Sequence, residues 1–358
     1  MTDDTAATGA PAPRANPELI GQAAAERVML AAWRSGRMPH AWLIGGPRGV
    51  GKATLAYRFA RFVLAGGGDA VGGLFGASGL DSLALPTGHS VFRHVAAGAH
   101  PDLVTVERQI NPETRKLRGE IIVDDIRDAG QFLHLTPVEG GWRAVIVDAA
   151  DDMNLNAANA LLKALEEPPR QALLLLVCHA PGRLLATIRS RCRYLALPPL
   201  SDEHVARLLD RFRPGLAEDD RAALVALADG SIGRALDLAD RGGIELYREM
   251  VALLARGPDI DVPAVYAFAD GVARGGSDAA AGFRTAMELL AAWVERLARA
   301  ASGASTGSEI IAGEGAVHAR LAGSGGVERW IACWDKINLL ARRTESLNLD
   351  RRLVLIDA

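Results

Sequence analysis

Between residues 19 and 199, short apolar runs alternate with segments of helical periodicity, and this alternation constrains the fold more than any other feature. Most of the apolar runs are nearly continuous, as expected for strands buried on both faces of a parallel sheet. Strands that alternate with helices predict an α/β domain. The predicted strands are 41–46, 103–106, 144–148, 173–178 and 194–197, and the clearest helices between them are 52–64 and 154–166.

The length of 358 residues predicts about two to three domains. Strand signals stop after Pro199, and amphipathic helices follow to the end of the chain. The first residues are small and polar with three prolines, which favours a frayed, disordered tail over a targeting segment. The predicted divisions are a tail over 1–18, an α/β domain over 19–199, a small helical domain over 200–243 and a further helical domain over 244–358.

Composition excludes several classes of protein. The chain has 40 Lys+Arg against 43 Asp+Glu, so its net charge of −3 argues against coating nucleic acid or an anionic membrane through an overall field. Its three cysteines, Cys178, Cys192 and Cys333, are too few and too scattered for a disulfide framework or a zinc site. No apolar stretch is long enough to span a membrane. We therefore expect a cytoplasmic protein without zinc.

A glycine-rich loop joins the first predicted strand to the first predicted helix. Gly46, Gly49 and Gly51 allow backbone N–H groups to turn around a phosphate, and Lys52 follows at the helix N-terminus. This strand–loop–helix context is typical of a Walker A phosphate loop. The loop predicts a nucleotide site, and the alternative is a glycine-rich turn without a ligand.

The same site lacks two parts needed for hydrolysis. A working loop carries Ser or Thr after the lysine to coordinate Mg²⁺, but this chain has Ala53, with Thr54 one position late and about 100° around the helix. Asp148 ends a predicted strand where a metal-binding carboxylate belongs. Ala149 follows it in place of a general base, whose loss costs about 10²- to 10⁴-fold in rate. We therefore predict a degenerate site that either binds no nucleotide or holds ATP or ADP without hydrolysing it.

Four arginines lie between residues 183 and 193 with no acidic residue among them. For Arg183, Arg189 and Arg193 we favour an ordinary solvated basic face. Arg191 is different because it stands between Ser190 and Cys192, directly before a predicted strand. Its planar guanidinium suits the stabilisation of charge on a transferring phosphoryl group.

Several motifs in this order together resemble the clamp loader of bacterial DNA polymerase III, a family of AAA+ proteins. The resemblance is strong over residues 19–240. The motifs are Leu19-Ile20-Gly21-Gln22, His40-Ala41, the loop that ends Gly51-Lys52, Asn159-Ala160-Leu161-Leu162-Lys163, Leu165-Glu166-Glu167-Pro168-Pro169 and Ser190-Arg191-Cys192.

The resemblance implies a fold and a set of partners. It implies an AAA+ P-loop domain, a helical lid over 200–243 and a helical oligomerisation collar over 244–358. The two alanines resemble the non-motor delta-prime branch of the family, in which Arg191 would be an arginine finger for a neighbouring tau/gamma subunit. Implied partners are the tau/gamma and delta subunits and, through the complex, the sliding clamp and primed DNA. The residue at the family's second-sensor arginine is Gly233 here, with Arg234 displaced by one position.

Two other functions stay open at this point. One is an active, tau/gamma-like ATPase, against which Ala53 and Ala149 speak. The other is a replication or repair adaptor that binds nucleotide outside a clamp loader. The Gly-rich segment 66–89 stands where many clamp-loader subunits carry a four-cysteine zinc module, and we interpret it as a mobile surface insertion of unassigned role.

Overall fold

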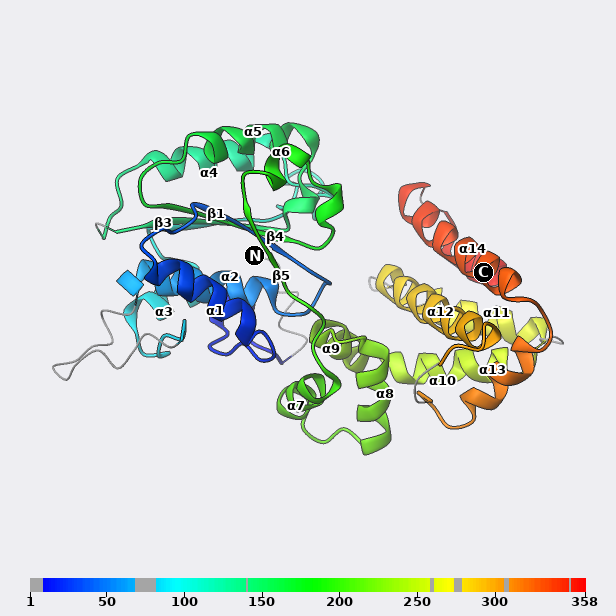
Figure 1. Cartoon of the computed structure of the whole chain (residues 1–358). Coiled ribbons are helices and arrows are strands. Elements are labelled where there is room, and N and C mark those ends of the chain that lie inside the picture. Colours follow the sequence, from blue (N-terminus) through cyan, green and yellow to red (C-terminus); the bar gives the residue numbers. More distant parts are fainter. Residues whose placement is uncertain are drawn as a thin grey trace. The chain divides into compact units, whose positions relative to one another are not determined.

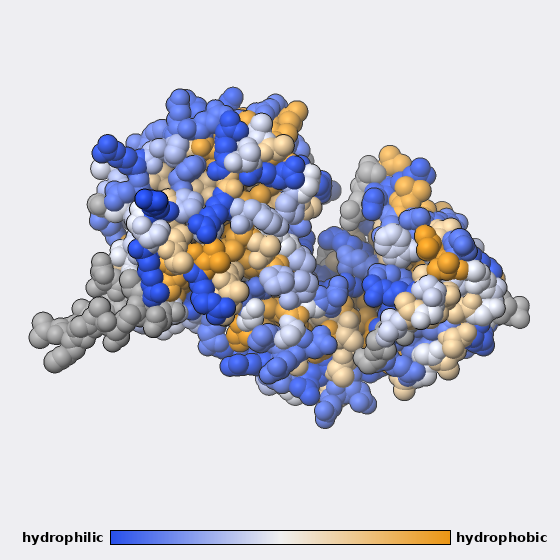
Figure 2. Space-filling model, viewed as in Figure 1, coloured by the Kyte–Doolittle hydropathy of each residue, from blue (hydrophilic) through white to orange (hydrophobic). Residues whose placement is uncertain are grey.

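The computed structural model describes residues 9–67, 82–139, 141–257, 261–273, 279–305, 309–347 and 349–358. The chain divides into two compact units. The first holds Met1–Val205 with Gly230–Gly233, and the second holds Ala206–Asp229 with Arg234–Ala358. Space-filling atoms on the visible face are mostly hydrophilic, with apolar ones between them (Figure 2). Among the described residues, no helix is both long and apolar enough to cross a membrane.

A five-stranded parallel sheet forms the centre of the first unit, in the order β2-β3-β4-β1-β5 (Figure 1). Each strand lies within one residue of its predicted bounds at both ends, so the α/β prediction is confirmed. Burial on both faces explains why the runs of the three inner strands β3, β4 and β1 are nearly all apolar, whereas edge strand β5 is mostly exposed. The strands are β1 Ala41–Gly45, β2 Leu103–Val106, β3 Arg143–Asp148, β4 Ala172–Cys178 and β5 Arg193–Ala196.

Helices cover both faces of this sheet (Figure 1). Alternate strand residues point to opposite faces, so Ile146 of β3 packs in one core and Val147 packs in the other. The first core lies beneath α1 Ala23–Arg34, α2 Lys52–Leu64 and α3 Ser90–Ala96. The second lies beneath α4 Val123–His134, α5 Leu155–Glu166 and α6 Ala186–Arg189.

The N-terminal segment differs from the predicted tail where the structure describes it. Residues 1–8 lie outside the described residues, but Pro13–Ala15 form a 3₁₀ turn against α2. Arg61 of α2 is 1% exposed and donates to the carbonyls of Arg14 at 2.8 Å and Asn16 at 2.7 Å. Burial lowers the pKa of Arg61 to about 10. A buried guanidinium must be hydrogen-bonded, and backbone carbonyls of this segment supply the acceptors.

The segment predicted as a surface insertion is only partly within the described residues, because 68–81 lie outside them. Leu83 is fully buried and Leu85 is 6% exposed, and both join the core beneath α1 and α2. The prediction of a surface segment over 66–89 is therefore wrong for these two residues. Their apolar side chains bury area that the preceding glycines cannot supply.

The second unit is entirely helical in its described residues. The most extensive packing in this unit is between α12 Ala279–Ala301 and α14 Val327–Leu347. Phe283, Met287 and Trp293 are buried on α12, and Ile337 is buried on α14. This unit joins residues 206–229 with residues 234–358. The expected boundary between two helical domains near residue 243 stays a prediction. The helices are α7 Asp202–Phe212, α8 Glu218–Ala228, α9 Ile232–Asp240, α10 Gly243–Leu254, α11 Val262–Ala273, α12 Ala279–Ala301, α13 Glu314–Ala322, α14 Val327–Leu347 and α15 Arg351–Asp357, of which α7 and α9 begin in the first unit.

Candidate functional site

The glycine-rich loop connects β1 to the N-terminus of α2, as predicted. Gly46, Gly49 and Gly51 have φ values of 150°, 78° and 99°, which L side chains rarely adopt. A Cβ atom at Gly46 would lie 2.2 Å from the carbonyl oxygen of Leu197. The loop conformation therefore requires glycine at these positions, whereas a role for them in binding nucleotide stays a prediction.

Lys52 is the first residue of α2 and is 3% exposed. Its Nζ donates to the carbonyl oxygens of Gly46 at 2.8 Å and Pro47 at 2.5 Å. Burial lowers the pKa of Lys52 to about 8, although Asp148 and Asp151 favour the charged form. The ammonium is thus satisfied by carbonyls of its own loop, a contact that the sequence did not predict.

Asp148 is the last residue of β3. In the sheet, β4 lies between β3 and β1, the strand that leads into the glycine-rich loop. Burial, followed by the charge of Glu107, raises the pKa of Asp148 to about 6, while Lys52 opposes the shift. Ala149 and Ala150 follow and are 4% and 0% exposed. The positions after the strand therefore place packed methyl groups where a general base would be needed.

The two aspartates that come next are occupied elsewhere. Asp151 accepts the backbone N–H of His179 at 2.9 Å and of Ala180 at 3.1 Å, which ties this turn to the end of β4. Asp152 pairs with Arg108 at 3.2 Å. Both carboxylates thus stabilise loops.

A magnesium site does not fit the residues present. Ala53 packs against the core and offers no oxygen, while Thr54 is 8% exposed within α2. Across the described residues, no group of three or more His, Cys, Asp or Glu side chains could hold a metal ion. Lys52 Nζ is bonded to carbonyls of its own loop, and the binding of a nucleotide without a metal stays a prediction for this site.

The outer side of the loop is covered by residues 230–233 of the same unit. The backbone N–H of Gly233 donates to the carbonyl of Gly49 at 3.2 Å. A Cβ atom at Gly49 would lie 2.2 Å from Ser231 Oγ and 3.0 Å from the Gly233 backbone. The position that the family resemblance assigns to a sensor arginine is therefore backbone packed on the loop, and no local pattern in the sequence indicated this contact.

His179 is a second residue that sequence reasoning missed. It follows β4, and its Nδ1 is buried without a hydrogen-bond partner in the described structure. Burial, followed by the charge of Lys52, lowers the pKa of His179 below its usual range. No motif in the sequence singled out this histidine.

Arg191 lies at the surface between α6 and β5. Its Nη1 donates to the carbonyl of Thr187 at 3.0 Å, and its Nη2 pairs with Glu166 Oε1 at 2.7 Å. Its side chain remains 36% exposed. Arg193, by contrast, lies over the ring of Trp42 at 5.0 Å. The predicted site residues therefore fall in two places, since Lys52 contacts its own loop and Arg191 contacts α5 and α6.

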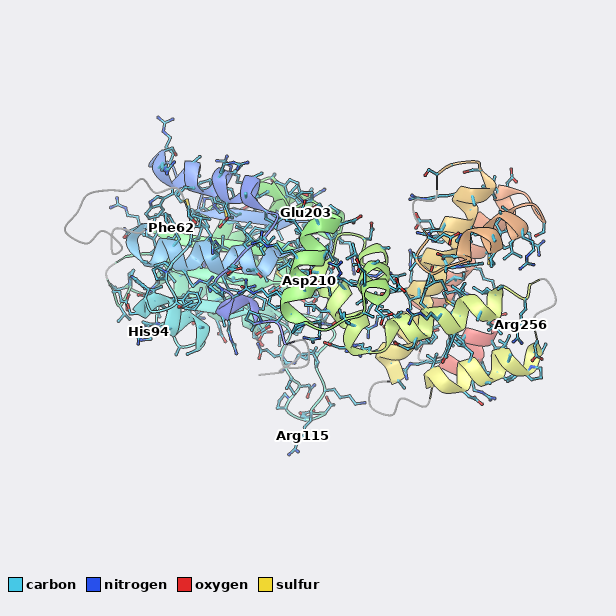
Figure 3. All side chains as sticks on the ribbon, turned by 90° about the horizontal axis from the view of Figure 1, so that it is seen from below. Phe62, His94, Arg115, Glu203, Asp210 and Arg256 are labelled. Carbon is cyan, nitrogen blue, oxygen red and sulfur yellow. The ribbon has the colours of Figure 1, made fainter. Side chains whose placement is uncertain are left out.

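Other polar features lie apart from the loop. A groove of about 560 Å³ is lined by Arg127 of α4 and by Asn156, Asn159 and Lys163 of α5. Figure 3 shows Arg115 on a loop that extends away from the sheet, where Asn111 Oδ1 accepts the N–H groups of two following residues. Neither feature includes a residue that the sequence analysis placed in the site.

The family model described as DNA polymerase III, delta subunit, matches residues 21–201. The chain belongs to this family. The resemblance predicted from the sequence is therefore confirmed, including its relation to delta-prime subunits: the chain is 36% identical over 212 residues to DNA polymerase III subunit delta' of Pseudomonas aeruginosa, covering 59% of each chain.

The chain is also similar to other known proteins. The chain is 34% identical over 218 residues to DNA polymerase III subunit delta' of Escherichia coli, covering 59% of this chain and 57% of the relative. It is 29% identical over 234 residues to the tau subunit of Salmonella typhimurium, covering 64% and 33%. A gamma subunit-related protein of Thermotoga maritima has a TM-score of 0.42 and 18% identity, covering 92% and 96%. The chain thus spans about three fifths of the delta' relatives that it matches.

A pH-dependent prediction follows from the burial of Asp148. Its pKa rises from 3.8 to about 6 on folding, so the folded state binds the proton more tightly and its stability falls as pH rises through this window. We expect Asp148→Asn to stabilise the chain above pH 6 by about 1–3 kcal/mol, since one pKa unit is worth about 1.4 kcal/mol. Thermal melts from pH 4 to pH 8 measure the gain, with exposed Asp128→Asn as control. A gain that does not change with pH would contradict this account.

Proposed function

We propose that this chain is a non-motor subunit of the delta-prime type in a DNA polymerase III clamp loader. In this role it helps to load the sliding clamp onto primed DNA in the cytoplasm, and ATP is hydrolysed by neighbouring tau/gamma subunits. The observation that carries the proposal is Arg191, whose guanidinium is 36% exposed and held at the surface, outside the chain's own loop. Family membership supports the setting.

The proposed chemistry of Arg191 acts across a subunit boundary. Its guanidinium is a planar cation that donates several hydrogen bonds in one plane. Placed against the phosphates of a neighbour's nucleotide, it would stabilise the negative charge that develops as the phosphoryl group leaves. Tau/gamma and delta subunits are the proposed partners, and the clamp and DNA are reached through the complex.

The chain's own loop would have a passive role. A bound ATP or ADP would be held by the backbone of Gly46, Gly49 and Gly51 and by Lys52. Its negatively charged phosphates would then replace the loop carbonyls that now accept hydrogen bonds from the Lys52 ammonium. Ala53 provides no metal ligand and Ala149 provides no base. Binding without hydrolysis is therefore the most that the site supports.

A direct prediction concerns magnesium. Since position 53 offers no hydroxyl, the metal should contribute little to any nucleotide affinity of the purified chain. We expect titration with a fluorescent ATP analogue to give dissociation constants within about two-fold of each other in Mg²⁺ and in EDTA, because only the cradle and Lys52 contribute. A matched control is Ala53→Ser, which restores a hydroxyl and should introduce magnesium dependence. Strong magnesium dependence in the unaltered chain would contradict the proposal.

Two experiments separate the proposal from its alternatives. Steady-state hydrolysis by the isolated chain should be negligible, whereas turnover comparable to a motor subunit would favour a tau/gamma-like ATPase. Mixing the chain with tau/gamma and delta subunits should give a stable complex on size-exclusion chromatography. Failure to assemble with them would favour an adaptor outside the clamp loader.

A further inference from the structure

The ion pair between Arg191 and Glu166 lies outside what the family resemblance implies. Glu166 is the last residue of α5, and its Oε1 lies 2.7 Å from Arg191 Nη2. We propose that Glu166 is a positioning residue for Arg191, which holds the guanidinium at the surface with its remaining donors facing outward. This inference rests on the proposed function of Arg191 as a donor to a neighbour's nucleotide.

The guanidinium is held from two sides. The carbonyl of Thr187 in the short helix α6 accepts from Nη1 at 3.0 Å, and it also accepts from the Ser190 hydroxyl at 3.1 Å. The Glu166 carboxylate accepts from Nη2 through a charge-assisted hydrogen bond. A guanidinium has five N–H donors, so these two contacts restrict its orientation and leave donors for a phosphate.

Glu166 itself projects from a fixed support. The preceding Leu165 is 3% exposed, and its carbonyl contacts His40 Nε2 at 3.1 Å. Helix α5 ends at Glu166, shortly before Pro168 and Pro169, which cannot continue it. The backbone at Glu166 is therefore anchored on the core, while its side chain is 50% exposed and reaches Arg191.

Exposure of both partners sets the size of the effect. An ion pair this open to solvent changes an equilibrium by no more than about five-fold. A weak pair suits a positioning role, because Arg191 can leave the carboxylate for a phosphate without a large penalty. We therefore expect loss of Glu166 to lower the hydrolysis rate that depends on Arg191 by about two- to five-fold, far less than loss of Arg191 itself.

The test uses the reconstituted clamp loader and its DNA-stimulated ATPase. At the site that receives Arg191, Glu166→Ala should lower the rate constant of hydrolysis by about two- to five-fold with KM for ATP unchanged, and Glu166→Gln, which keeps an oxygen acceptor, should recover part of the rate. The adjacent and exposed Glu167 provides the control, since Glu167→Ala should change nothing. Added salt should shrink the Glu166→Ala effect because exposed charges are screened.

A double-mutant cycle distinguishes positioning from a general structural role. In an Arg191→Ala background, Glu166→Ala should have no further effect, because the side chain that it positions is gone. A further loss in that background, or an effect equal to that of Glu167→Ala, would overturn the positioning role alone. If Arg191→Ala leaves the ATPase unchanged, both this inference and the proposed function fail.

Discussion

Replacing Arg191 with alanine is expected to slow ATP hydrolysis at the neighbouring site that receives it by about 10³-fold or more, the range found for arginine fingers supplied by another chain. The reason is that no other group on this chain would replace a charged, planar donor at the transferring phosphoryl group. The measurement is single-turnover hydrolysis by the reconstituted complex on primed DNA, in which one site should no longer hydrolyse ATP at a measurable rate.

The control for this prediction is Arg189→Ala in the same segment. Arg189 is exposed and should contribute only to the general charge of the surface. Both variants should keep the melting temperature of the isolated chain, because both side chains lie at the surface. Equal rates for the Arg191 and Arg189 variants would remove Arg191 from the catalytic account.

Replacing Glu314 with alanine is expected to give the largest loss of stability, about 3–5 kcal/mol in the free energy of unfolding. Glu314 is 1% exposed in the second unit. Its carboxylate accepts the N–H of Ile310 at 3.0 Å, pairs with Arg296 at 3.4 Å and accepts a hydrogen bond from the Tyr247 hydroxyl. Its removal would leave several polar groups in the interior without their acceptor.

Urea denaturation of the isolated chain measures this loss. The matched control is Glu328→Ala on α14, whose exposed side chain should change stability by less than about 0.5 kcal/mol. A change below about 1 kcal/mol for Glu314→Ala would show that the buried carboxylate does not organise these groups.

The sheet could be predicted from the sequence because its signals are local. Five apolar runs of suitable length, separated by helical periodicity and turn residues, mark the five strands to within one residue. The glycine-rich loop could also be predicted from the sequence, because glycine is the residue type that most readily adopts the positive φ values of this loop. The missing hydroxyl at Ala53 and the missing base at Ala149 could be recognised by position alone.

Contacts between distant residues could not be predicted in the same way. Arg61 looks like an ordinary charged helix residue, yet its burial against the carbonyls of Arg14 and Asn16 orders the segment expected to be a tail. Leu83 and Leu85 carry too short a pattern to indicate a core contact. In each case, tertiary packing decided the outcome where local periodicity was weak.

The site shows the same division. Lys52 and Arg191 were identified from motifs, but the loop carbonyls that bind Lys52 and the carboxylate that holds Arg191 depend on the folded geometry. Glu166 lies 25 positions before Arg191 in the chain. No spacing rule joins a helix end to a residue that follows a separate strand and a short helix.

The most direct test compares Lys52→Ala with Arg191→Ala, each in an otherwise intact reconstituted complex, by counting the ATP molecules hydrolysed per complex in a single turnover on primed DNA. The account predicts that Lys52→Ala leaves this count unchanged and that Arg191→Ala lowers it by one ATP molecule per complex, because one site no longer hydrolyses. A loss of hydrolysis with Lys52→Ala, together with an unchanged count for Arg191→Ala, would show that the chain hydrolyses ATP at its own site and would contradict the account.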